Sequence, residues 1–88
     1  MNDSLENLTP MNRAFAIMLG TQFARNPTTQ GAEQAAAELV ELQRTIAGDI
    51  DSILAMIDYI TSAMKPAEAR RTQLIITKKM EELRKAIA

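Results

Sequence analysis

The residues of this chain that could do chemistry are carboxylates, cations and hydroxyls, because the sequence has neither histidine nor cysteine. No serine lies in a recognisable nucleophile context. The three glycines, Gly20, Gly31 and Gly48, are too far apart to form a phosphate-binding loop. A pair of carboxylates can act as acid and base, but no spacing here indicates a pair held in a pocket. We therefore expect a protein that is not an enzyme and needs no cofactor.

The segment 49–52, Asp-Ile-Asp-Ser, has the alternating acidic residues of a calcium-binding loop. An EF-hand loop that began at Asp49 would need glycine at its sixth position and glutamate at its twelfth. Those positions are occupied by Leu54 and Ile60. On a helix, Asp49 and Asp51 would also point to different sides. We interpret the segment as a solvated face and expect no metal site.

The cations are concentrated near the C-terminus. Residues 65–88 hold seven cationic and three acidic residues, a net charge of +4, whereas residues 1–64 hold three arginines and eight acidic residues, a net charge of −5. The candidate binding residues of this basic segment are Arg70, Arg71, Lys78, Lys79, Arg84 and Lys85. A basic helix can neutralise phosphates and bind nucleic acid. Alternatively, these cations form helical pairs, Lys78 with Glu82 and Glu81 with Lys85, or lie beside an acidic neighbouring helix.

Three prolines divide the chain into three predicted helices. Thr9 and Pro10 are typical of an N-cap and a first helical residue, so the first helix should cover about 10–24. The second should cover 32–64 and be about 50 Å long, and the third 66–87, starting at Pro66. We expect residues 1–9 to be a disordered tail and residues 10–88 a single helical domain. Gly48 could break the second helix, but the apolar pattern passes through it without a slip, which favours a continuous helix.

An almost unbroken heptad stripe marks one side of the predicted second helix. Its positions are Ala36, Leu39, Gln43, Ile46, Ile50, Ile53, Ile57, Ile60 and Met64. Further apolar residues make this stripe wider than one short neighbouring helix can cover. The predicted oligomer or partner interface consists of Leu39, Val40, Leu42, Gln43, Ile46, Ile50, Leu54, Met56 and Ile57. The fold class that follows is all-α: a long central helix with two shorter antiparallel flanking helices, forming a homodimeric, coiled-coil-like bundle. A monomeric three-helix bundle is the alternative.

Two features of the predicted seams allow more than one interpretation. Gln43 and Gln73 are polar residues on the apolar stripes of the second and third predicted helices, respectively. There they could meet a partner chain and set its register, or lie at a solvated edge. Five methionines follow the first residue, at positions 11, 18, 56, 64 and 80. Core filling is favoured for them over a groove that accepts varied partner helices.

Taken together, the sequence predicts a non-enzymatic protein–protein interaction module: a small adaptor, chaperone-like partner or inhibitor. Its expected partners are a second copy and another protein. The alternative is a nucleic-acid accessory protein that uses the basic segment, although only Tyr59 offers an aromatic ring for base stacking. The longest apolar run, Ala14–Leu19, is far shorter than the roughly 20 residues of a membrane-spanning helix, so we expect a cytoplasmic protein. Small all-helical proteins of this kind are common among the accessory proteins of phages and secretion systems, an analogy that rests on size and fold class alone.

Overall fold

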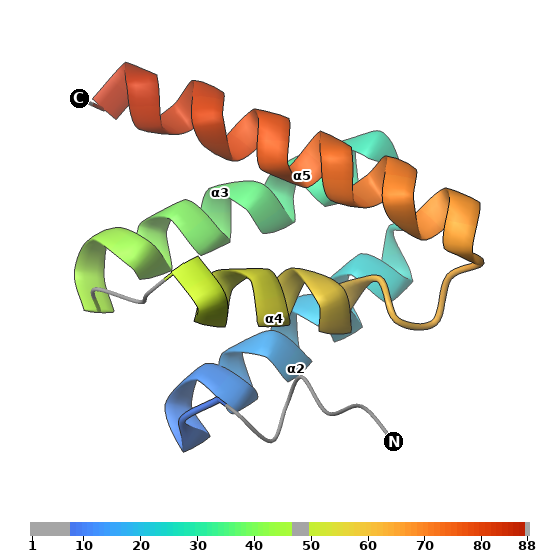
Figure 1. Ribbon diagram of the computed structural model, residues 1–88, viewed down its shortest axis with the longest axis horizontal. Helices are drawn as coiled ribbons and strands as arrows, with labels where there is room; N and C mark the ends of the chain where they lie inside the picture. Colours follow the sequence, from blue (N-terminus) through green and yellow to red (C-terminus); the bar gives the residue numbers. More distant parts are fainter. Residues whose placement is uncertain (1–7, 47–49, 88) are drawn as a thin grey trace.

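The computed structural model describes residues 8–46 and 50–87, without the side chains of residues 45, 46 and 87, and shows four helices (Figure 1). They are α2 (Pro10–Arg25), α3 (Thr29–Ile46), α4 (Ile50–Ile60) and α5 (Pro66–Ile87). Within these ranges there is no β-strand. The predicted all-α class is therefore confirmed, but the prediction of three helices is wrong.

The difference lies in the predicted long central helix. The segment expected as one helix over 32–64 contains α3 and α4, which run in opposite directions (Figure 1), and α4 ends at Ile60. The predicted continuity through Gly48 concerns residues 47–49, which lie outside the described ranges. A straight helix of about 50 Å would exceed the longest dimension of the molecule, 35 Å. Because the two helices run in opposite directions, both can bury their apolar sides within one chain. The burial of that apolar surface stabilises the arrangement.

The helix starts follow from local capping. The Thr9 hydroxyl accepts a hydrogen bond from the backbone N–H of Asn12 at 3.1 Å and Pro10 follows it, as predicted. The Thr28 hydroxyl accepts from the backbone N–H of Gly31 at 3.1 Å, so α3 begins at Thr29, three residues before the predicted Ala32. α5 begins at Pro66, as predicted.

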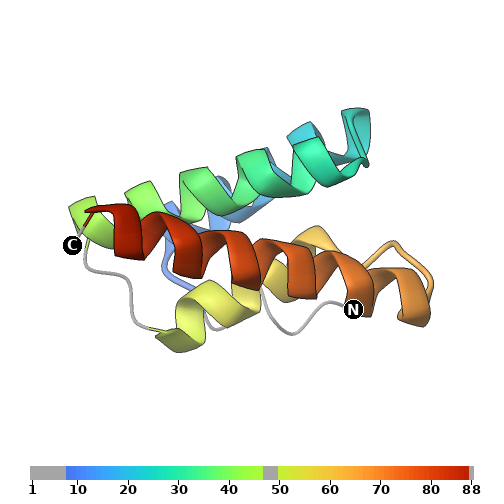
Figure 2. The same ribbon diagram turned by 90° about the horizontal axis from the view of Figure 1, so that it is seen from above.

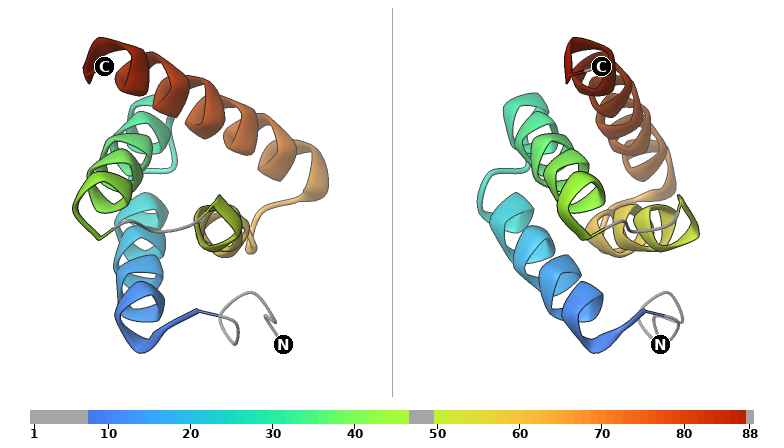
Figure 3. Two further views of the ribbon diagram at one scale, coloured as in Figure 1. Left: turned by 60° about the vertical axis from the view of Figure 1, so that its left-hand side comes forward. Right: turned by 90° about the vertical axis from the view of Figure 1, so that its left-hand side faces the viewer.

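The four helices form two layers, one of α2 and α4 and the other of α3 and α5 (Figure 2). Within each layer the two helices run in the same general direction (Figure 1). Seen from the end, the order around the bundle is α2, α3, α5, α4, so that α2 and α5 occupy opposite corners (Figure 3). The main partner of α5 is therefore α3, which runs in the same direction (Figure 1), whereas the sequence predicted that the C-terminal helix runs antiparallel to a single helix over 32–64. The antiparallel packing of α5 on α4 is less extensive.

The core lies where the two layers meet. Its large buried side chains are Leu8, which precedes α2, Leu19 and Phe23 of α2, Leu39, Val40 and Leu42 of α3, Ile53, Met56, Ile57 and Ile60 of α4, and Ile76 and Met80 of α5. Ala16, Ala32 and Ala36 are also buried and let the helices approach closely. None of the described helices has the length and apolar character needed to cross a membrane.

Candidate interaction surface

The fold buries most of the interface predicted from the sequence. Leu39, Val40, Leu42, Met56 and Ile57 are at most 5% exposed and belong to the core of a single chain. The side chain of Ile46 lies outside the described part of the structure. Because α3 and α4 belong to different layers of the same bundle, helices of the same chain cover these side chains almost completely.

Two residues of the predicted interface remain accessible, and both lie on α4. Ile50 is 61% exposed and Leu54 52%, and their spacing of four places them on one side of the helix. On α5, the neighbouring Leu74 is 66% exposed. The sequence alone does not predict this exposure, because it depends on which neighbour α5 packs against.

Leu54 and Leu74 border a hollow between α4 and α5 with a volume of about 410 Å³. The other residues lining this hollow are Ile57, Asp58, Arg70, Gln73 and Thr77. We use the name α4–α5 surface for Ile50, Leu54 and Leu74 together with these lining residues. It combines four aliphatic side chains with two uncharged polar side chains, one cation and one carboxylate.

Hydrogen bonds inside the chain hold α5 in place beside this surface. The side-chain amide of Gln73 donates to the Thr61 hydroxyl at 2.9 Å and to the Asp58 carboxylate at 3.3 Å. At the far end of α5, the guanidinium of Arg84 donates twice to the side-chain oxygen of Gln43, at 2.8 and 3.2 Å. Gln43 and Gln73, the two polar residues of the predicted apolar stripes, therefore both form hydrogen bonds within their own chain.

The six cations singled out from the sequence divide into two groups. Arg84 bonds to Gln43, and Lys79 forms an ion pair with Glu82 at 3.7 Å, in place of the predicted pairing of Glu82 with Lys78. At 3.6 residues per turn, the other four lie on the same outward side of α5 as Leu74. These four are Arg70, Arg71, Lys78 and Lys85. In residues 8–46 and 50–87 all four are exposed, and no ion pair is found for any of them.

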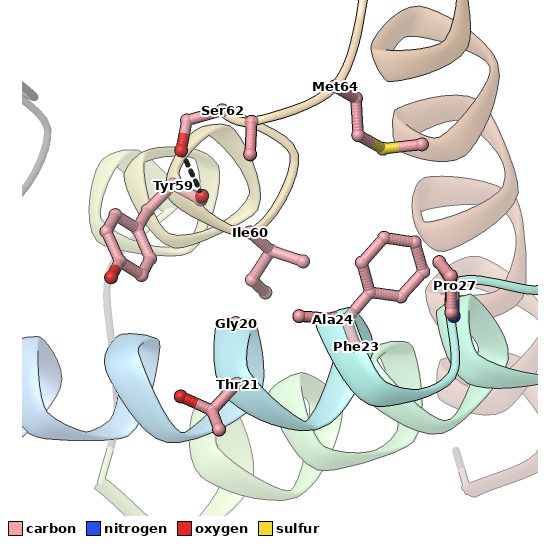
Figure 4. Close-up of a pocket in the computed structure, with 10 residues that line it drawn as sticks. Gly20, Thr21, Phe23, Ala24, Pro27, Tyr59, Ile60, Ser62 and Met64 are labelled. Carbon is pink, nitrogen blue, oxygen red and sulfur yellow. Dashed lines mark hydrogen bonds between the residues drawn. The ribbon is translucent and has the colours of Figure 1, made fainter.

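A second hollow, of about 470 Å³, lies between the C-terminal halves of α2 and α4 (Figure 4). Its lining is mainly apolar and includes Phe23, Ile60 and Met64. Two of its hydroxyls form hydrogen bonds within the chain: Ser62 donates to the backbone oxygen of Tyr59 at 2.7 Å, and Thr21 donates to a backbone oxygen of its own helix at 2.9 Å. None of the lining residues carries a carboxylate, amine or guanidinium.

Groups that bind metal ions or activate nucleophiles are not gathered elsewhere in the described residues. The structure places no three acidic side chains together there in a way that could hold a metal ion. Asp51 of the predicted solvated face is exposed, and Asp49 lies outside the described ranges. In the same part of the chain, no buried side-chain nitrogen or oxygen lacks a hydrogen-bond partner. What the surface offers is apolar and cationic contact.

No protein-family model, no curated protein and no solved structure matches this chain. Its function must therefore be inferred from the chemistry of its surfaces.

Proposed function

We propose that this protein is a non-enzymatic protein–protein interaction module whose α4–α5 surface binds an amphipathic helix with acidic residues on another protein. The observation that carries the proposal is the combination of three exposed aliphatic side chains, Ile50, Leu54 and Leu74, with cations along the outer side of α5. An adaptor, a chaperone-like partner or an inhibitor would each use such a surface.

The apolar part of the surface supports a helical occupant. Exposed large aliphatic residues that cluster around a hollow are typical of interaction sites. The hollow of the α4–α5 surface lies between two helices, and a third helix would fit there with anchors spaced three, four and seven residues apart. Leu54 and Leu74 on either side of the hollow would contact those anchors.

The charge supports an acidic occupant. Arg70 lines the hollow, and Arg71, Lys78 and Lys85 lie on the same side of α5. The acidic residues nearby are Glu81 on α5 and Asp58, which also lines the hollow. Carboxylates flanking the apolar anchors of a partner helix would therefore meet cations. Such complementarity mainly speeds association and selects the partner, and salt screens it.

The test uses two synthetic helical peptides of about 18 residues, roughly five turns, with identical leucine anchors. One peptide has glutamates beside the anchors and the other has lysines. We expect the glutamate peptide to bind, as measured by fluorescence anisotropy, and the lysine peptide to bind at least about tenfold more weakly. The double variant Leu54→Ser/Leu74→Ser should weaken binding of the glutamate peptide by a similar factor.

The matched control is Met11→Ser, which removes an equally exposed apolar side chain from α2. It should leave the dissociation constant of the glutamate peptide unchanged. Equal affinity for both peptides, or an equal loss in the control, would contradict the proposal.

Nucleic-acid binding is the second candidate, because Arg70, Arg71, Lys78 and Lys85 share one side of α5 with no ion pair among the described residues. It ranks second because Tyr59 is half-buried and its ring lies against Gly20, where it offers no open stacking platform. If this candidate is correct, oligonucleotides should bind regardless of sequence, with affinity that falls steeply with salt and is lost in Arg70→Glu/Lys78→Glu. No measurable oligonucleotide affinity at low salt would reject it.

We also propose that the protein acts in the cytoplasm. The support is the sequence without cysteine, which suits a reducing compartment. Fractionation of cells that produce the tagged protein tests this, and recovery in a secreted or envelope fraction would contradict it.

A further inference from the structure

We propose that the hollow between the start of α3 and the first half of α5 binds a free α-amino acid with an aliphatic side chain, such as leucine. Its volume is about 480 Å³, within the range of small-molecule sites. We use the name α3–α5 hollow for the space bordered by Thr29 and Ala32 of α3 and by Glu68, Arg71, Thr72 and Ile75 of α5. The two helices lie side by side (Figure 2), and their N-terminal ends meet at this hollow.

A buried threonine of the α3–α5 hollow has a hydroxyl group that is left for a ligand. Thr72 is 7% exposed and lines the hollow. Thr61 and Thr77 donate to the backbone oxygen four residues earlier, at 3.0 and 2.8 Å. In residues 8–46 and 50–87 the Thr72 hydroxyl makes neither this bond nor any other. Every fully buried side-chain oxygen in those residues has a partner, so the Thr72 oxygen reaches the hollow, where it can bond to a bound molecule.

A carboxylate fits the α3 end of the hollow. The first N–H groups of a helix have no acceptor within the helix, and the helix dipole attracts anions to this end. The Thr28 hydroxyl accepts from Gly31, which leaves the N–H of Thr29, the first residue of α3. On the α5 side lies Arg71, whose exposed guanidinium can bind a carboxylate through two hydrogen bonds.

Glu68 disfavours a simple anion and favours a ligand that also carries a positive charge. It lines the same hollow and lies three residues before Arg71, about one turn away on the same side of α5. Despite this spacing, neither side chain forms an ion pair within residues 8–46 and 50–87. An amino acid would satisfy both groups, with its ammonium at Glu68 and its carboxylate at Arg71.

The apolar part of the lining accepts an aliphatic side chain. Ala32 is buried, and Met64 and Ile75 are half-buried. The methionine side chain is flexible, so Met64 can adjust to the shape of a bound group. Contact of a leucine side chain with these residues would remove apolar surface from water. Glycine, which has the same charges without the side chain, should therefore bind more weakly than leucine.

Titration of the ¹⁵N-labelled protein with leucine, followed by amide chemical shifts, tests the site. We expect shifts at Thr29 and Thr72 that saturate within about 20 mM leucine. Three comparison probes are N-acetylleucine, which lacks the ammonium, leucinamide, which lacks the carboxylate, and inorganic phosphate. Each should bind at least about tenfold more weakly at about pH 6, where the free amines are protonated.

Matched variants separate the contacts of the hollow from general effects on α5. Thr72→Val keeps the size of the side chain and removes its hydroxyl, and Arg71→Gln removes the cation. Each should raise the dissociation constant for leucine at least about fivefold. The controls Thr77→Val and Arg70→Gln make the same replacements at exposed positions outside the hollow and should leave that constant unchanged. The circular-dichroism melting temperature of each variant verifies that it is folded.

Four outcomes would overturn the inference. They are the absence of shifts at Thr29 and Thr72, equal binding of phosphate or N-acetylleucine, equal binding of leucinamide, and unchanged leucine binding in Thr72→Val. Equal binding of phosphate would indicate an anion site, and equal binding of leucinamide a site for the N-terminal residue of a peptide. The inference is independent of the proposed function, although both use Arg71. Binding of the glutamate peptide to Thr72→Val is a separate readout, so failure of one is distinguishable from failure of the other.

Discussion

At the scale of single residues, Gly31 shows that a helical position can require glycine for a reason outside the helix. Glycine in a helix interior is about 1 kcal/mol less favourable than alanine. At Gly31, however, a methyl group would overlap the backbone oxygen of Asn26. That oxygen is held in place by a hydrogen bond from the backbone N–H of Thr28 at 2.8 Å.

We therefore expect Gly31→Ala to lower the free energy of unfolding by about 1–3 kcal/mol, because the backbone must shift to relieve the overlap. Urea denaturation measures this change. The control is Gly20→Ala, whose new methyl group would lie 3.0 Å from a ring carbon of Tyr59, a side chain that can rotate away. An unchanged or higher stability of Gly31→Ala would contradict the expectation.

At the scale of the helices, α5 has two apolar residues close together with opposite environments. Ile76 is fully buried in the core, and Leu74 is 66% exposed. We expect Ile76→Ala to lower the free energy of unfolding by about 2–5 kcal/mol, and Leu74→Ala to change it by less than about 0.5 kcal/mol. Thermal or urea denaturation of the two variants measures the difference. Similar losses in both would mean that Leu74 is covered in solution.

The arrangement of the helices also determines which residues of the predicted interface are buried and which are exposed. A heptad stripe shows that one side of a helix is apolar, but it does not show which neighbour covers that side. Leu39 and Met56 belong to the predicted interface and are buried by the chain itself, whereas Leu54, from the same prediction, is exposed. The difference arises from the reversal between Ile46 and Ile50.

At the scale of the whole molecule, the folded-back chain predicts a small particle. The Cα radius of gyration is 12.0 Å and the dimensions are 35 × 28 × 19 Å. Small-angle X-ray scattering at low protein concentration should give a radius of gyration only slightly above 12.0 Å, because side chains and bound water add to it. A clearly larger radius of gyration, with a maximum dimension well beyond ~50 Å, would instead indicate the continuous central helix.

The sequence by itself determined the features that depend on residues within one or two turns of each other. These are the helical class, the capping of α2 by Thr9 and the start of α5 at Pro66. Capping bonds and apolar periodicity are local, so a single sequence contains them.

Only the tertiary structure decided which apolar residues are core and which are surface. That outcome depends on contacts between distant parts of the chain, such as Gln43 with Arg84 and Thr61 with Gln73. The free energy gained by burying α3 and α4 against α5 and α2 is a property of the assembled bundle, and no local pattern encodes it. The exposure of Leu54 and Leu74, on which the proposed function rests, follows from that assembly.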